Sequence, residues 1–299
     1  MGQADVPIEL IIVDNGSEDG SLAELRDRFP HARFIEMGYN SGFTGGMNAG
    51  IAAASGEYVL LQNADLLLAD NYCAGAVATM QKEPQVGAVG GKVYRLANGQ
   101  RTTELDACGY TLSRTFRTRL LEPDAERDVL GVSGSCPVFR VAALSTIRAP
   151  VGYVLDPWYF AYSEDVDLML RLNLAGWRVR YVPHLLAWHV RSGSSVPASR
   201  FYEKPDHYQV HHFKNRIATI VKCLPTRLLL RMALPLLLTE LALPAYLVWH
   251  RPASVANWLH GWSAVRGELS RLLRDRRGIH SGDGPANTAR VQSLLATGR

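Results

Sequence analysis

The chain has 299 residues, enough for one large α/β domain with an appended helical part. Hydrophobic residues make up 47% of the chain and charged residues 20%, which excludes a disordered protein. The net charge of +4 is too small to indicate a nucleic-acid-binding surface. Four cysteines without a C-x-x-C pair favour buried thiols in a reducing cytosol.

The first predicted unit is a buried strand at residues 8–13 (IELIIV), followed by the turn DNGS, a helix and a second strand. Asp14 begins that turn at the carboxyl end of the strand, where ligands bind in open α/β sheets. A plain turn built from turn-forming residues explains the same letters. Because Asp14 follows the apolar strand directly, we favour a ligand contact for its side chain.

A glycine-rich loop at residues 40–50 (NSGFTGGMNAG) runs into the next predicted helix. Such backbone can approach a diphosphate closely, although the glycine spacing matches neither a P-loop nor a dinucleotide fingerprint. Asp65 follows another buried strand, in the sequence NAD. There it could bind a hard cation through oxygen or cap a turn, and its position alone leaves both alternatives open.

Residues 156–189 combine an aromatic approach, an acidic pair, a helix and a strand. Glu164 and Asp165 begin the predicted helix, and Gly176 is suited to end it. Partial positive charge at the helix N-terminus stabilises an ionised carboxylate, which suits a general base. The same acids could also be ordinary first-turn residues of a helix.

Residues 228–249 are almost entirely apolar, but they include Arg231, two prolines and Glu240. A confident transmembrane span needs about 20 clean apolar residues, so we expect helices that lie in or against a membrane interface. A core helical hairpin is the alternative. Arginines that accumulate up to residue 277 favour an anionic membrane surface, and residues 276–299 are predicted to be a polar, mobile tail.

Three motifs occur in a fixed order: VDNGSEDGS, then NSGFTGGMNAG with QNAD, then FAYSEDVDLMLRLNLAGW. Together they resemble the family-2 glycosyltransferases of the GT-A fold, particularly the rhamnosyltransferase-like branch. The resemblance implies an α/β, Rossmann-like mixed sheet with a C-terminal helical extension. It divides the chain into a glycosyltransferase domain at 1–225, an apolar and basic membrane-associating region at 226–275, and the tail at 276–299.

The resemblance also implies a site. Asp165 matches the catalytic base, with Glu164 beside it, while Asp65 and His189 would hold a divalent cation, Mg²⁺ or Mn²⁺. Asn63 stands where the family's D-x-D-type motif has its first acid. On the donor side the resemblance implies contacts from Asp14, Asn40, Gly42, Asn48 and Asn63. On the acceptor side it implies flat aromatic faces from Trp158, Tyr159 and Tyr162.

The implied reaction is an inverting transfer of a sugar, with rhamnose as one candidate, from a nucleoside diphosphate donor. The acceptor would be a glycan or a polyprenyl-linked glycan, handled at the cytoplasmic face of the cell membrane during surface polysaccharide synthesis. Relatives normally open with a strand of the V-x-V-I-I-V-x-Y-N kind and a helix before DNGS. Without that central strand we expect two unpaired strand edges, and a non-catalytic relative that binds nucleotide or glycan is the alternative function.

Overall fold

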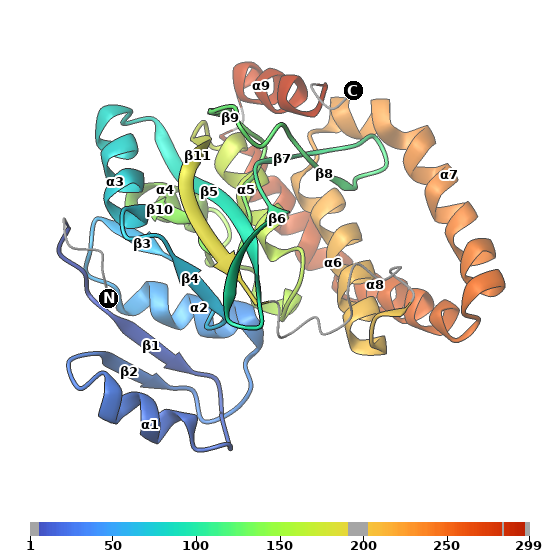
Figure 1. The fold of residues 1–299 in the computed structure, drawn as a ribbon. Coiled ribbons are helices and arrows are strands. Elements are labelled where there is room, and N and C mark those ends of the chain that lie inside the picture. The colour runs from blue at the N-terminus through green and yellow to red at the C-terminus, as the bar shows by residue number, and fades with distance from the viewer. Residues whose placement is uncertain (1–5, 191–202, 283, 297–299) are drawn as a thin grey trace.

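The computed structural model describes residues 6–190, 203–282 and 284–296 (Figure 1). Its strands are β1 (Ile11–Asp14), β2 (Arg33–Glu36), β3 (Tyr58–Leu60), β4 (Leu66–Leu68), β5 (Val86–Ala97), β6 (Gln100–Ala107), β7 (Tyr110–Leu112), β8 (Thr118–Leu120), β9 (Arg127–Asp128), β10 (Val138–Arg140) and β11 (Arg178–His189). Its helices are α1 (Ser21–Arg28), α2 (Gly42–Ala53), α3 (Tyr72–Lys82), α4 (Val141–Arg148), α5 (Glu164–Leu174), α6 (Asp206–Cys223), α7 (Thr226–His250), α8 (Ala253–His280) and α9 (Pro285–Ala296), with a 3-10 turn, η1, at Pro157–Tyr159. The α/β class predicted from the sequence is confirmed.

A seven-stranded mixed sheet lies at the centre of the fold, in the order β3-β10-β5-β11-β4, with β6 on β5 and β9 on β11. Strands β5 and β11 run parallel, and β10 runs antiparallel to β3 and β5. A side chain at Gly91 of β5 would place Cβ 1.9 Å from the carbonyl oxygen of Leu185, where the register of β11 shifts. Helices α2, α4 and α5 pack on one face of the sheet and α3 on the other.

Strands β1 and β2 form a separate parallel pair beside this sheet (Figure 1). Among the described residues no strand pairs with the other edge of β1, and β3 ends the larger sheet with a free edge. Two unpaired edges are the arrangement that we expected from the sequence. Backbone N–H and C=O groups at such edges need water or another partner to avoid a free-energy cost.

The helix that carries the acidic pair begins and ends where the sequence predicted. Gly176 has a φ of 88°, a conformation that glycine adopts without steric cost. Its N–H donates to Asn173 O at 3.2 Å, and the N–H of Trp177 donates to Leu172 O at 3.0 Å. This pair of bonds is the Schellman motif, which satisfies carbonyls at the end of a helix.

The C-terminal helices pack on the sheet domain, and α6 runs along α8 (Figure 1). The prediction of a mobile tail at 276–299 differs from the structure, because α8 continues to His280 and α9 packs against α5 and β7. Val291 of α9 is fully buried, and Thr111 Oγ1 donates to Leu294 O at 2.6 Å. Apolar residues at helical spacing in a polar sequence explain why α9 docks.

Candidate active site

The segment before α5 holds an unusual backbone conformation. Phe160, Tyr162 and Ser163 have φ angles of 65°, 72° and 62°, a region that residues other than glycine rarely adopt. Ser163 is the N-cap of α5, yet its side chain accepts no hydrogen bond from the helix. The segment therefore needs support from neighbouring elements to keep the first turn of α5 in place.

Glu164 and Asp165 form the start of α5. Burial raises the pKa of Asp165, although N–H groups of Val166 and Gly134 bond its carboxylate. Burial, and then the charge of Asp165, raise the pKa of Glu164, whose Oε2 is buried without a hydrogen-bond partner among the described residues. A carboxylate with a raised pKa accepts a proton more readily, so this pair has the chemistry of a general base.

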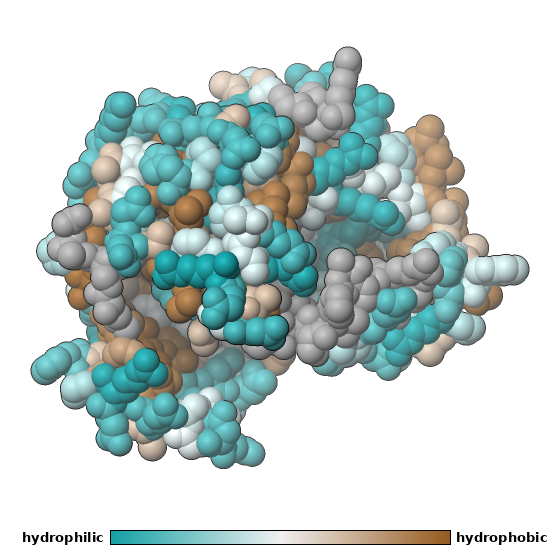
Figure 2. Space-filling model, in the orientation of Figure 1, coloured by the Kyte–Doolittle hydropathy of each residue, from teal (hydrophilic) through white to brown (hydrophobic). Residues whose placement is uncertain are grey.

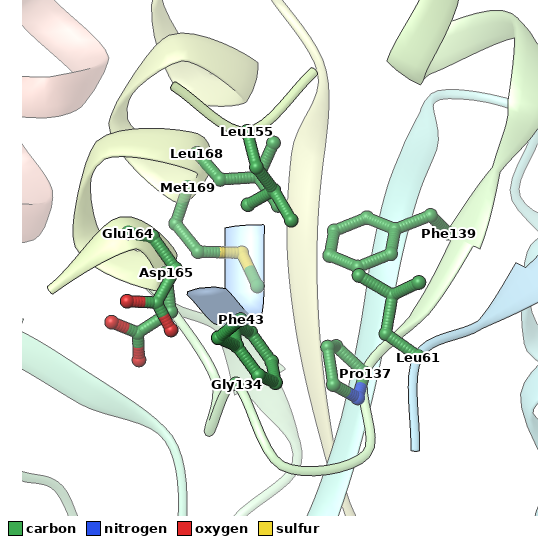
Figure 3. Close-up of a pocket in the computed structure, with 10 residues that line it drawn as sticks. All are labelled: Phe43, Leu61, Gly134, Pro137, Phe139, Leu155, Glu164, Asp165, Leu168 and Met169. Carbon is green, nitrogen blue, oxygen red and sulfur yellow. The ribbon is translucent and has the colours of Figure 1, made fainter. Parts of the chain in front are cut away.

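A small apolar cavity adjoins the acidic pair (Figure 3). Its other lining residues are Phe43, Leu61, Gly134, Pro137, Phe139, Leu155, Leu168 and Met169. The two carboxylate groups point away from Phe139 and Leu61 on its far side. Burial of the two carboxyl groups is the main cause of their raised pKa values, because a buried site solvates the charged form poorly.

The aromatic residue predicted at the centre of the acceptor wall is instead part of the core. Tyr159 is fully buried, and its hydroxyl shares a hydrogen bond of 2.7 Å with Thr219 and donates to Asp167 at 3.3 Å. The prediction that Tyr159 offers a face to an acceptor sugar is therefore wrong. The pattern of aromatic residues in this stretch does not predict which side chain α6 buries.

Trp158 and Tyr162 remain partly exposed. The Nζ of Lys214 lies 4.0 Å from the centre of the Trp158 ring, a cation–π contact. Tyr162 packs on Tyr208 with ring centres 4.2 Å apart. Both rings are supported from α6, and acceptor contact by either one stays a prediction.

A buried ion network lies beneath this wall. Lys222 Nζ lies 2.7 Å from Asp156 Oδ2 and 3.0 Å from Asp167 Oδ1, and all three side chains are at most 1% exposed. Arg171 Nε donates to Asp167 Oδ2 at 2.8 Å, and Arg271 contacts Asp156 at 3.1 Å. Burial would raise the pKa of both carboxyls, but the charge of Lys222 holds them below their ordinary values. The network joins η1 and α5 to α6 and α8.

The residues predicted to hold a cation lie together. Strand β4 pairs antiparallel with β11, so that His189 stands opposite Leu66 and its Nε2 lies 3.1 Å from Asp65 Oδ1. The other ring nitrogen, Nδ1, lies 3.3 Å from Asp106 Oδ2, as in metal sites where a carboxylate orients a ligating histidine. Asp106 gave no signal in the sequence.

Asn63 completes this part of the site. Its side-chain oxygen is buried without a hydrogen-bond partner among the described residues, so it is an acceptor atom that a cation or a ligand hydroxyl could satisfy. No group of three or more His, Cys, Asp and Glu side chains in the described ranges could hold a metal. Asp65 and His189 stay the predicted ligands among the described residues, and their oxygen and nitrogen donors would suit Mn²⁺ better than Mg²⁺.

Asp14 lies at the carboxyl end of β1, as predicted. Its carboxylate accepts from the N–H of Ser17 at 3.1 Å and of Gly16 at 3.3 Å. Hydrogen bonding to Ser17 is the main cause that lowers the pKa of Asp14. The turn thus holds Asp14 ionised, and its contact with a donor stays a prediction.

The glycine-rich loop bonds to neighbouring protein segments. Asn40 Oδ1 accepts from the N–H of Gly42 at 3.0 Å, and Asn15 Oδ1 accepts from the N–H of Ser41 at 2.9 Å. A Cβ at Gly42 would lie 2.5 Å from Phe160. The structure therefore places Gly42 against the strained segment, and its contact with the donor's diphosphate stays a prediction, as does that of Asn40. Asn15, whose position in the sequence predicts only a turn, holds the loop.

Asn48 also has a different role from the predicted one. Its Nδ2 donates to Leu155 O at 2.7 Å, and its Oδ1 accepts from the N–H of Leu155 at 3.0 Å. Because both ends of the amide bond to this backbone, Asn48 fixes the entry to the aromatic stretch rather than lining the donor's diphosphate.

A short loop joins the two halves of the site. The N–H of Asn63 donates to Ser135 O at 3.0 Å, and a Cβ on the adjacent Gly134 would lie 2.9 Å from Cβ of Asp165. The segment that bears Asp65 and the acidic pair of α5 are therefore separated by a single loop. This arrangement brings the predicted cation ligands and the predicted general base to the same loop.

Comparison with known proteins identifies the family. Residues 2–148 match the family described as glycosyl transferase family 2. The chain is 29% identical over 235 residues to N-acetylglucosaminyl-diphospho-decaprenol L-rhamnosyltransferase of Mycobacterium tuberculosis, which covers 69% of this chain and 72% of that protein. These matches assign residues 2–148 to glycosyl transferase family 2. The resemblance read from the three motifs is thus confirmed.

A second relative is the poly-beta-1,6-N-acetyl-D-glucosamine synthase of Staphylococcus epidermidis, 25% identical over 185 residues, which cover 60% of this chain and 42% of that protein. Among solved structures, S. aureus TarS in complex with UDP-GlcNAc has a TM-score of 0.58 at 14% identity and covers 100% of this chain and 86% of TarS. GalNAc-T7, solved with UDP, GalNAc and Mn²⁺, has a TM-score of 0.54 at 14% identity, covering 72% of this chain and 41% of GalNAc-T7. These likenesses confirm the GT-A fold of this family 2 enzyme.

Proposed function

We propose that this family 2 enzyme transfers a sugar from a nucleoside diphosphate donor to a glycan or lipid-linked acceptor in the synthesis of a cell-surface polymer. The observation that carries the proposal is the acidic pair of α5, which one loop separates from the Asp65–His189 pair. The rhamnosyltransferase and the polysaccharide synthase among its relatives support this reaction class. Rhamnose and N-acetylglucosamine are therefore the first donor sugars to test.

The proposed step is a single displacement. Ionised Asp165 takes the proton of an acceptor hydroxyl as its oxygen attacks the anomeric carbon of the donor sugar. The bond from that carbon to the diphosphate oxygen breaks, the nucleoside diphosphate leaves with the electron pair, and the configuration inverts. Fixing both substrates in line supplies much of the rate enhancement.

Glu164 has a different charge state from Asp165 in this proposal. Its pKa is raised by burial and by the charge of Asp165, so a protonated Glu164 can donate a hydrogen bond to a substrate oxygen while Asp165 is ionised. Its unpartnered Oε2 supports this assignment.

Asp65 and His189 are the proposed cation ligands, with Asp106 orienting the imidazole. A bound divalent cation would neutralise charge on the departing diphosphate. The Mn²⁺ found with UDP in the GalNAc-T7 structure supports Mn²⁺ for this chain.

We also propose that α7 contacts the cytoplasmic face of a membrane. It is long and apolar enough to cross one, and 17% of its most apolar window is buried, which argues against a core helix. Figure 2 shows apolar side chains along the outer edge that α7 forms. Its exposed apolar residues include Leu230, Leu234, Leu237, Leu238, Leu241, Val248 and Trp249.

The acidic residue of α7 does not face outward with these side chains, whereas Arg227 and Arg231 near the start of the helix are exposed. Glu240 pairs with Arg216 of α6 and accepts from the indole N–H groups of Trp258 and Trp262, each at 3.2 Å. Buried residues along α7, from Leu228 to Leu247, hold its other face on the protein. These contacts support a helix that lies on a lipid surface rather than one that crosses it.

The experiment that tests the proposed reaction incubates the protein with Mn²⁺, a panel of nucleoside diphosphate sugars and a polyprenyl-diphosphate N-acetylglucosamine acceptor. We expect acceptor-dependent release of a nucleoside diphosphate from one donor, and a product extended by one sugar. A protein that binds a donor but extends no acceptor would support the non-catalytic alternative.

A further inference from the structure

The strained segment before α5 is held from outside at almost every backbone carbonyl. The Nδ2 of Asn215 on α6 lies 3.1, 2.9 and 2.7 Å from the carbonyl oxygens of Tyr159, Ala161 and Tyr162. The remaining carbonyl, of Phe160, accepts from the N–H of Thr44 in α2 at 3.0 Å. Backbone that other elements bind in this way can persist in a costly conformation.

Asn215 is placed for this contact alone. Its side chain is fully buried, and its Oδ1 has no hydrogen-bond partner among the described residues. Three carbonyl oxygens can face only the amide nitrogen, so the orientation of the amide group is not ambiguous. A buried oxygen left without a partner costs free energy, which indicates that the position is used for its donors.

Lys214, the residue before Asn215, also binds the segment before α5. Lys214 Nζ donates to the carbonyl oxygen of Trp158 and lies over the Trp158 ring. Helix α6 therefore binds the segment from Trp158 to Tyr162, and Glu164 and Asp165 follow two residues later. The position of the acidic pair depends on a helix that lies outside the residues matched by the family, 2–148.

We infer that Asn215 is a positioning residue for the acidic pair: its amide holds the strained segment so that Asp165 meets the acceptor hydroxyl. The expected effect of Asn215 on kcat rests on the proposed function. Its expected effect on the conformation of the segment does not. A misplacement near 1 Å in a reacting group can lower a rate on the order of 100-fold. Loss of the Asn215 amide should therefore act on the chemical step and spare donor binding.

The test compares Asn215→Ala and Asn215→Asp with wild type and with a control, Asn257→Ala. Asn257 of α8 is also buried and donates to Asp206 at 3.0 Å and Gln209 at 3.3 Å, so its loss should destabilise the C-terminal helices without touching the segment. Two readouts apply to each variant: hydrogen–deuterium exchange of residues 158–166, and kcat with the KM for the donor sugar found in the donor screen.

Both Asn215 variants should speed exchange in residues 158–166 and lower kcat by about 10- to 100-fold with donor KM unchanged. Asn215→Asp should be at least as severe as Asn215→Ala, because it sets an acceptor against three carbonyl oxygens although its shape is the same. If the Asn215 side chain only filled space, Asn215→Asp would be milder than Asn215→Ala. Asn257→Ala should lower the melting temperature and leave exchange of the segment and kcat at wild-type values.

A rescue variant tests the strain directly. Ser163→Gly removes the steric cost of a φ of 62° at a residue whose side chain makes no capping bond. Added to Asn215→Ala, it should restore part of the lost protection and of the lost kcat. If Asn215→Ala yields no folded protein, Lys214→Met should give the same changes in milder form.

Asn215→Asp with wild-type exchange and kcat would overturn the inference, as would equal loosening of the segment in Asn257→Ala. Failure of the proposed function gives a different result. In that case wild type transfers no sugar from any donor, while the Asn215 variants still speed exchange of the segment.

Discussion

Lys222→Met should destabilise the fold strongly, because it removes the cation shared by two buried carboxylates. Lys222 is fully buried and lies 2.7 Å from Asp156 and 3.0 Å from Asp167. Breaking a buried ion pair by removing one partner costs about 3–5 kcal/mol. The lower end applies here, since Arg271 and Arg171 remain as partners of Asp156 and Asp167.

A loss of about 3 kcal/mol corresponds to a fall in melting temperature of roughly 6–12 °C for a chain of this size class. Differential scanning calorimetry of wild type and variant measures it. Lys82→Met is the matched control, because Lys82 is exposed and such substitutions change stability by about 0.5 kcal/mol or less. A loss below about 1 kcal/mol for Lys222→Met would refute a stabilising role for the network.

The pH dependence of this difference follows from the pKa shifts. The lowered pKa values of Asp156 and Asp167 give stability that is present above their unfolded values and lost as pH falls through the folded ones. The raised pKa of Lys222 gives stability that is present below its unfolded value and lost as pH rises through the folded one. The difference between wild type and Lys222→Met should therefore be largest between about pH 5 and 9 and shrink in acid.

Three further predictions address the metal, the membrane and the histidines. Asp65→Ala should weaken Mn²⁺-dependent donor binding measured by calorimetry, and equal wild-type affinity in chelator and in Mn²⁺ would contradict the cation site. The double variant Leu234→Glu, Leu238→Glu should sediment less with anionic vesicles at low salt than wild type does. The control Leu120→Glu, which changes an exposed leucine on β8, should sediment as wild type does. Wild type that does not sediment with anionic vesicles would refute the lipid contact. Burial lowers the pKa of His211 and His212 to about 4, so between about pH 6.5 and 4 the unfolded chain binds more protons than the folded one. The free energy of unfolding should therefore fall as the pH drops through this range. A His212→Gln variant whose free energy of unfolding falls with pH as steeply as that of wild type would count against this cause.

The parts of the site that the sequence predicted are those with local signals. Glu164 and Asp165 stand at a helix start, and Gly176 at its end, because capping depends on residues a few positions apart. Asp14 follows an apolar strand directly, and strand ends are where ligands bind in α/β sheets. The pairing of Asp65 with His189 came from the resemblance to a family, not from spacing.

The parts that could not be predicted depend on contacts between distant segments. Asp106, Asn215 and Lys222 each meet their partners only after β11 and α6 have packed, and no periodicity records that packing. Lys222 did carry a usable signal, since a lysine in the apolar run IATIVKC needs a buried partner. The sequence around Tyr159 does not predict that α6 buries this side chain, so the expectation that it contacts the acceptor is wrong.

The central claim is that Asp165 of the acidic pair deprotonates the acceptor in a sugar transfer. The most direct measurement compares acceptor-dependent sugar transfer, and donor affinity by calorimetry, for wild type, Asp165→Asn and Glu164→Gln. The account predicts that Asp165→Asn binds the donor as wild type does and transfers no sugar, while Glu164→Gln keeps part of its activity because glutamine can still donate a hydrogen bond. Wild-type turnover in Asp165→Asn would contradict the account.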